Sequence, residues 1–146
     1  MQRYQHILVA VELIDDSDNA LMKKVNDISS GDSSAKITLL HAVEHLNTFG
    51  AYYTVAAGVD VEELAITDAK KALTKFQSQL KVNAKNLIVK VGHAPQVILK
   101  TAEELGCDLI VIGSHGRHGL GLLLGSTANG VLHGAKCDVL AVRVHD

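Results

Sequence analysis

Glycine, serine and histidine are concentrated in one short stretch, residues 113–127, which reads GSHGRHGLGLLLGST. This stretch follows the apolar run 109–112 and precedes a segment with helical patterning from Ala128. It is therefore predicted to lead from the carboxyl end of a buried strand into a helix, which is where open α/β sheets bind ligands. Because glycine lacks a Cβ and adopts positive φ, successive N–H groups in such a loop can converge on an anion. The chemistry that this pattern favours is phosphate binding.

Further polar groups are expected at the same edge of the sheet. Glu12 follows the first predicted strand, residues 41–44 follow the second, and residues 92–93 follow the third. A topological switch between the first and fourth strands would open a crevice there. In that crevice the hydroxyls of Ser126 and Thr127 could donate to a phosphate, and Glu12 could contact a ribose hydroxyl or a phosphate-bound Mg²⁺. Together these residues describe a mononucleotide site.

Other nucleotide and hydrolase motifs are not matched. Residues 121–126 contain no lysine, so there is no P-loop of the form G-x-x-x-x-G-K-[ST]. Gly119 and Gly121 lack the third glycine of a dinucleotide fingerprint. Ser114 lies outside any G-x-S-x-G elbow and has no Asp-His arrangement to activate it. No catalytic residue is predicted, and the chain is not expected to be an enzyme.

Histidines near this edge raise the alternative of a zinc site. The five in question are His41, His45, His93, His115 and His118. Their spacing is irregular and no cysteine joins them, so no metal site is predicted. Arg117 has two readings that the sequence leaves open, a phosphate contact and a solvated side chain.

The elements that must position these residues alternate between strand and helix patterns. Residues 6–12 form a continuous aliphatic run, typical of a parallel strand covered on both faces, and further strands rich in aliphatic residues are predicted at 36–43, 86–91, 109–112 and 138–144. Helical spacing covers 15–28, 61–80, 95–105 and 128–135. Residues 44–58 have no sustained period and are expected to form a lid or a partner surface. This alternation predicts an α/β fold with a five-stranded parallel, doubly wound sheet in a single domain, residues 1–146.

Composition limits the classes of partner. The chain has 14 Lys and Arg against 16 Asp and Glu, a net charge of −2, with no block of like charges, so neither nucleic-acid nor membrane binding is expected. The sequence has neither a signal-peptide pattern nor an apolar stretch of membrane-spanning length, which favours a cytoplasmic location. The last predicted strand, which begins at Asp138 and ends at Val144, is an aliphatic edge. Pairing with the same strand of a second copy would protect it, which predicts a homodimer.

Two cysteines, Cys107 and Cys137, are too few for a disulfide framework or a four-ligand zinc site. Each precedes an aspartate at the entrance to a predicted strand, where a small buried side chain is the simpler interpretation. If the two strands are neighbours the thiols could be close, which leaves a redox role as the alternative.

The sequence resembles the universal stress proteins of the UspA family over essentially its full length. The resemblance rests on residues 7–12, 39–43, 92–94, 108–117, 125–126 and 137–143. It implies a Rossmann-like, five-stranded parallel sheet of order 3-2-1-4-5 that binds adenine nucleotides and a dimer formed through the last strand.

ATP-binding members of that family carry G-x2-G-x9-G-[ST]. Gly113, Gly116, Gly125 and Ser126 occupy this motif, with eight residues between the second and third glycines where the family has nine. Glu12 stands where ATP binders typically have Asp. The resemblance implies a ligand site that comprises Ala10, Val11, Glu12, Ala42, Gly113, His115, Gly116, Arg117, Gly125, Ser126 and Thr127.

The function predicted is a homodimeric, cytoplasmic stress-response protein that binds ATP or AMP, with or without Mg²⁺, as a regulatory ligand that it does not turn over efficiently. Slow ATP hydrolysis or autophosphorylation, which the resemblance allows, has no positioned base to support it. The alternative is a nucleotide-free interaction module in which the glycine loop only shapes the fold and residues 44–58 meet a protein partner. An adenylate-handling enzyme is disfavoured because the chain has no second substrate domain.

Overall fold

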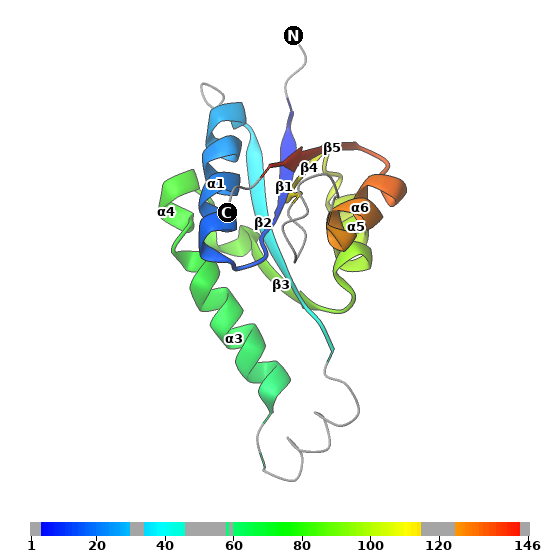
Figure 1. The fold of residues 1–146 in the computed structure, drawn as a ribbon. Helices are drawn as coiled ribbons and strands as arrows, with labels where there is room; N and C mark the ends of the chain where they lie inside the picture. The colour runs from blue at the N-terminus through cyan, green and yellow to red at the C-terminus, as the bar shows by residue number, and fades with distance from the viewer. Residues whose placement is uncertain (1–3, 30–33, 46–57, 59, 115–124, 144–146) are drawn as a thin grey trace.

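The computed structural model of the 146-residue chain describes residues 4–29, 34–45, 58, 60–114 and 125–143. Five parallel strands form one sheet in the order β3-β2-β1-β4-β5 (Figure 1). The strands are β1 His6–Ala10, β2 Lys36–Val43, β3 Leu87–Val91, β4 Leu109–Gly113 and β5 Asp138–Val142. This confirms the doubly wound sheet and its strand order.

Helices cover both faces of the sheet, which explains why its strands are continuously aliphatic. The helices are α1 Asp15–Ser29, α3 Val61–Thr74, α4 Gln77–Leu80, α5 Ala94–Leu105 and α6 Ser126–Gly134. One face packs on α1, α3 and α4 through a cluster that includes Met22, Leu73 and Phe76. The other face packs on α5 and α6 through a cluster that includes Ile98 and Val131. The central strands β1 and β4 are therefore buried along their full length.

The helix predicted over 61–80 is interrupted, which corrects the sequence-based expectation. Helix α3 ends at Thr74, and the Phe76 N–H bonds the Leu73 carbonyl oxygen over 3.1 Å, a three-residue step that tightens the chain before α4 begins at Gln77. Phe76 and Leu80 remain buried on the same core cluster. The apolar spacing was compatible with one helix because both pieces bury the same face.

Other element ends differ from the predictions by one to two residues. Strand β1 ends at Ala10, before the predicted limit of Glu12, and a short 3-10 helix, Ala84–Asn86, occupies the position expected to begin β3. Helix α6 begins at Ser126, earlier than the predicted Ala128, while β5 ends at Val142 rather than continuing to the predicted Val144, which lies outside the described residues. The earlier start of α6 matters most, because it makes Gly125 the N-cap residue.

Helices α5 and α6 approach each other closely where the first turn of α5 meets the middle of α6. A Cβ on Gly130 would lie 2.9 Å from the Cβ of Pro95, closer than side chains pack. The glycine therefore lets the backbone of α6 lie against the proline ring of α5. This contact holds the amino ends of the two helices side by side at one edge of the sheet.

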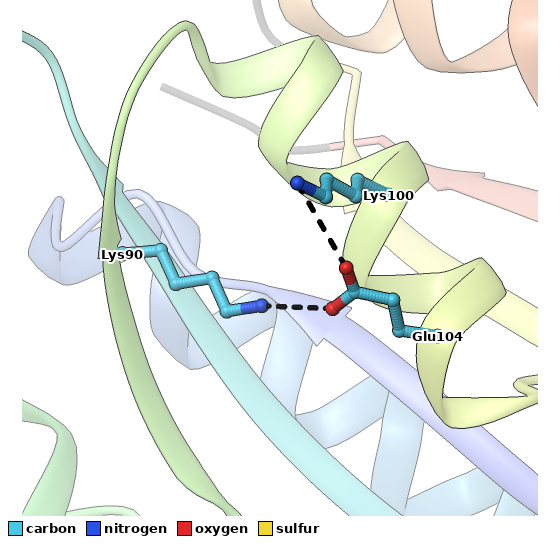
Figure 2. A network of polar contacts seen from close by, with 3 residues as sticks. All are labelled: Lys90, Lys100 and Glu104. Carbon is cyan, nitrogen blue, oxygen red and sulfur yellow. Dashed lines mark hydrogen bonds and ion pairs between the residues drawn. The ribbon is translucent and has the colours of Figure 1, made fainter.

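Charged side chains tie the edge strand β3 to α5 (Figure 2). The Glu104 carboxylate lies 3.4 Å from the ammonium nitrogen of Lys90 on β3 and 3.9 Å from that of Lys100 on its own helix. These groups are 40–78% exposed, and exposed ion pairs contribute little to stability, about 0–1 kcal/mol. No helix in the described part of the chain is long and apolar enough to cross a membrane.

Candidate functional site

A cavity of about 480 Å³ opens at the carboxyl edge of the sheet, where the connections from β1 and β4 diverge. Its walls come from the ends of β1, β2 and β4 and from the amino-terminal turns of α5 and α6. The lining residues are Ala10, Val11, Glu12, Ile14, Leu40, His41, Ala42, Glu44, Ala94, Ile98, Ile112, Gly125, Ser126, Thr127 and Ala128. Its size lies within the usual range of small-molecule pockets, roughly 300–1,000 Å³.

The amino terminus of α6 faces this cavity with its first turn uncapped by a side chain. Gly125 is the N-cap residue, with φ −60° and ψ 155°, and it has no side chain to accept from the following amides. No acidic residue stands in the first turn. The first amides of a helix lack intrahelical partners and carry the positive end of the helix dipole. The geometry therefore suits a bound anion at Ser126 and Thr127.

A backbone hydrogen bond closes the segment that leads to α6. The Gly125 N–H donates to the Ser114 carbonyl oxygen over 3.1 Å, and the Ser114 N–H donates to the Val142 carbonyl oxygen over 2.8 Å. Residues 114 and 125 are thus fixed to each other and to β5. The end of β4 and the start of α6 are in contact, whatever path residues 115–124 take.

The amino terminus of α5 is occupied by a carboxylate of the chain itself. Glu44, just past the end of β2, accepts a hydrogen bond from the Ala94 N–H at 3.1 Å, and His93 Nδ1 lies 3.7 Å from the same oxygen. This carboxylate fills the position that an anion would otherwise take. Two helix amino termini line the cavity. Within the described residues, α5 has a carboxylate of the chain at its first turn, whereas α6 has neither a side-chain cap nor an acidic residue in its first turn.

His41 is held by the backbone at the end of β1. Its Nδ1 lies 2.7 Å from the Val11 carbonyl oxygen. A carbonyl only accepts, so Nδ1 carries a proton and donates, which leaves Nε2 as an acceptor when the ring is neutral. This bond fixes the ring at the mouth where β1 and β2 end.

Seven of the site residues expected from the sequence line this one cavity. They are Ala10, Val11, Glu12, Ala42, Gly125, Ser126 and Thr127. Gly113 ends β4 beside them without lining the cavity. His115, Gly116 and Arg117 lie outside the described residues. The convergence of the amides of residues 113 and 116 therefore stays a prediction.

The site predicted from the sequence lacked the apolar wall of the cavity and the contact of the Glu44 carboxylate with the start of α5. Ile14 and Ile98 line the cavity, and neither carries a signal that separates it from a core residue. Glu44 was placed at this edge without its contact to Ala94, a contact between groups fifty positions apart in the chain. The histidines considered for zinc have separate contacts where they are described: His41 bonds Val11, His93 faces Glu44, and His45 Nδ1 lies 3.7 Å from Glu62.

A family model described as the universal stress protein family matches residues 3–143, nearly the whole chain. The chain belongs to the universal stress protein family. Two curated members from Coxiella burnetii are similar over nearly their full length. Universal stress protein A homolog 2 is 54% identical, over 99% of this chain and 98% of the homolog. Universal stress protein A homolog 1 is 36% identical, over 95% of this chain and 96% of the homolog.

Solved structures of universal stress proteins share the fold. The universal stress protein UspA from Lactobacillus plantarum superposes with a TM-score of 0.72 at 27% identity, covering 98% of this chain and 100% of its own. A universal stress protein solved in complex with cAMP has a TM-score of 0.62 at 23% identity and covers 99% and 100%. The Rossmann-like universal stress protein fold is thereby established for this chain.

Proposed function

We propose that this universal stress protein binds an adenine nucleotide, ATP or AMP, in the carboxyl-edge cavity as a regulatory ligand. The observation that carries the proposal is the open amino terminus of α6, which lines the same cavity as the Glu12 carboxylate. The amides at the amino terminus of α6 suit a phosphate, and the Glu12 carboxylate suits a ribose hydroxyl or a phosphate-bound Mg²⁺. A family member of the same fold was solved with cAMP, another adenine nucleotide.

Different walls of the cavity suit different parts of the nucleotide. Small and apolar groups at Ala10, Val11 and Ala42 form the part that suits a flat base. Gly125, Ser126 and Thr127 form the part that suits the phosphates, through backbone amides and two hydroxyls. By the family motif, Gly113 and Gly116 would complete the phosphate side, with the neighbouring His115 and Arg117 as further candidates.

Binding without efficient turnover fits the groups that surround the cavity. Hydrolysis of a phosphoanhydride needs a residue that orients the attacking water at the terminal phosphate. The Glu44 carboxylate is engaged with the Ala94 amide at the other helix, so it is unsuited to that role. The protein is accordingly assigned a sensing or regulatory role.

We further propose that the chain forms a homodimer through β5, whose outer edge has no neighbouring strand in the described sheet. The Val142 carbonyl points toward β4, since it accepts from Ser114, so the backbone groups of its neighbour Ala141 point outward. Ala141→Pro removes an outward N–H and is expected to yield monomers in sedimentation velocity. Ala141→Ser, which keeps that N–H, is the matched control. A dimer that persists in Ala141→Pro places the interface elsewhere.

The nucleotide proposal is tested by calorimetry of the purified protein with ATP and Mg²⁺, and with AMP and cAMP separately. Saturable heat with a matching rise in melting temperature is expected, because a ligand well above its Kd stabilises the native state. If millimolar nucleotide gives neither heat nor a thermal shift, the binding proposal fails.

A nucleotide-free interaction module is the second candidate, and one observation favours it. Val61 and Leu64 lie three residues apart in the first turn of α3 and are 38% and 54% exposed, so they present two aliphatic side chains on the surface of the helix. They directly follow the irregular segment that the sequence predicts as a partner surface. This candidate is preferred if the calorimetry shows no binding and substitution of Leu64 by Asp removes association with a protein partner.

A further inference from the structure

The two cysteines meet at the amino edge of the sheet, opposite the nucleotide cavity. Strands β4 and β5 are paired neighbours, with Leu109 in register with Asp138. Cys107 lies two residues before Leu109, and Cys137 lies one residue before Asp138. Both cysteines therefore stand just before the starts of two hydrogen-bonded strands, and such strands lie ~4.8 Å apart. Disulfides span Cα separations of ~4.4–6.8 Å.

Both cysteines also belong to the same face of the sheet. Cys107 is part of the core cluster beneath α5 and α6, and Cys137 packs against that cluster. Neither is in a disulfide, and Cys107 is buried while Cys137 is half-buried. The two side chains therefore lie on the same side of the sheet, as a bond between them requires.

A second cavity, of about 230 Å³, is lined by both cysteines. The rest of its wall is mostly aliphatic, with Leu99, Ala102 and Ile110 among its residues. Glu103 and Lys136 also line it and form an ion pair of 3.2 Å. The space is larger than a small oxidant such as hydrogen peroxide requires, so a reagent of that size can reach the thiols without unfolding of the sheet.

The surroundings keep both groups as thiols at neutral pH. Burial is the main cause that raises the pKa of Cys107 to about 11; the neighbouring Cys137 and Asp108 act in the same direction, and Lys36 acts in the opposite one. Burial and the nearby Asp138 and Asp108 also raise the pKa of Cys137. The thiolate is the reactive form, so this pair is expected to react slowly.

We propose that Cys107 and Cys137 form a dithiol site that a small hydroperoxide converts to an intramolecular disulfide. The Cys137 thiol releases its proton, the thiolate attacks a peroxide oxygen and the O–O bond breaks. The departing hydroxide takes up that proton, which gives a sulfenic acid and one water from hydrogen peroxide. The Cys107 sulfur then attacks the sulfenic sulfur, the S–O bond breaks, and a second water leaves. Two thiols are oxidised and one peroxide is reduced. Cys137 attacks first because it is the more exposed of the two.

The disulfide joins the starts of β4 and β5 and closes a loop that contains α6 and residues 113–127. Such a link pins the edge strand that we propose as the dimer interface. It is expected to raise the melting temperature by roughly 5–10 °C. Its formation does not depend on the nucleotide proposal, since the two cavities share no lining residue.

The test is intact mass spectrometry of the native protein after exposure to hydrogen peroxide, with alkylation of any remaining thiols. The expected result is a loss of about 2 Da, reversed by dithiothreitol, and a Cys107–Cys137 peptide in a non-reducing digest. In Cys107→Ser, dimedone is expected to label Cys137. In Cys137→Ser, labelling of Cys107 is expected to be at least several-fold slower.

The same treatment of the unfolded chain in guanidinium provides the comparison. The proposal is overturned if the unfolded chain forms the bond while the native protein keeps both thiols through prolonged exposure. Covalent dimers on a non-reducing gel, in place of the intramolecular bond, would overturn it as well. Melting of the oxidised and reduced protein then measures the stabilisation independently of any ligand.

Discussion

The Gly125 N–H donates to the Ser114 carbonyl oxygen over 3.1 Å, so the two ends of the phosphate segment are bonded to each other. Ser114 is in turn bonded to Val142 of β5. The position of the α6 amino terminus is therefore set by the sheet. The shorter spacing between Gly116 and Gly125, eight residues where the family motif has nine, does not displace Gly125 from the end of β4.

Insertion of one glycine after Gly121 restores the family spacing and is expected to change the Kd for ATP by less than about three-fold. The reason is that loops accommodate a length change cheaply when their ends are fixed. Calorimetry on the insertion variant and the parent protein measures the difference. A tightening of ten-fold or more would mean that the shorter loop, and not the α6 terminus, limits binding.

Ser126→Asp is expected to weaken ATP binding by at least ten-fold while it stabilises the protein. A carboxylate in the first turn of α6 stabilises the helix dipole by about 0.3–1 kcal/mol, and it repels the phosphates that we assign to that turn. Calorimetry gives the affinity and chemical denaturation gives the free energy of unfolding.

Asn129→Asp is the matched control for this charge. Asn129 is exposed on the same helix but does not line the cavity. The Asn129→Asp variant should bind ATP with an affinity within about two-fold of the parent value, since solvent screens the added charge there. Equal losses in the two variants would place the phosphates away from Ser126.

Glu44→Gln is expected to tighten ATP binding by roughly two- to five-fold at low ionic strength, and by less at high salt. The glutamine oxygen can still accept from the Ala94 amide, so the change removes the charge and retains the bond. Glu104→Gln is the matched control, because Glu104 is on α5, does not line the cavity and gives the same change in net charge (Figure 2). If both variants behave alike, net charge alone is responsible and Glu44 has no local effect.

The free energy of unfolding is expected to fall as the pH drops below about 6.5, with His6 as one cause. Its Nε2 lies 2.8 Å from Thr38 Oγ1 in the core, and burial, with the charge of Lys36 added, lowers its pKa. The folded state thus prefers the neutral ring, so this stability is complete above the ordinary pKa and is lost as the pH falls toward the lowered one. Denaturant melts of His6→Gln between pH 7.5 and 5 should show a shallower decline. Parallel curves for the variant and the parent would remove His6 from the explanation.

The sequence was sufficient for the strands because each is rich in aliphatic residues, and β4 is an uninterrupted aliphatic run up to Gly113, as expected of a strand covered on both faces. The helical pattern predicted for residues 95–105 stops where α5 stops, at Gly106, whose φ of 67° ends the helix. The break between α3 and α4 was not foreseeable, because Phe76 and Leu80 keep the spacing of one helical face.

The candidate site also has a part that the sequence could predict and a part that it could not. Glu12, Ala42 and Ser126 come at the carboxyl ends of strands or at a helix start, and parallel topology alone brings such positions together. The Glu44–Ala94 bond depends on the distance between the ends of β2 and α5, which no local pattern encodes. The closeness of Cys107 and Cys137 was conditional on neighbouring strands, and the pairing of β4 with β5 meets that condition.

The central claim is that the phosphates of an adenine nucleotide bind the first turn of α6. Titration of ¹⁵N-labelled protein with ATP, and separately with adenosine, tests it at the level of single amides. The amide signals of Ser126, Thr127 and Ala128 are expected to shift saturably with ATP and much less with adenosine, while those of Asn83 and Lys85 stay fixed with both. Saturation with ATP that leaves the α6 amides unmoved would contradict the claim.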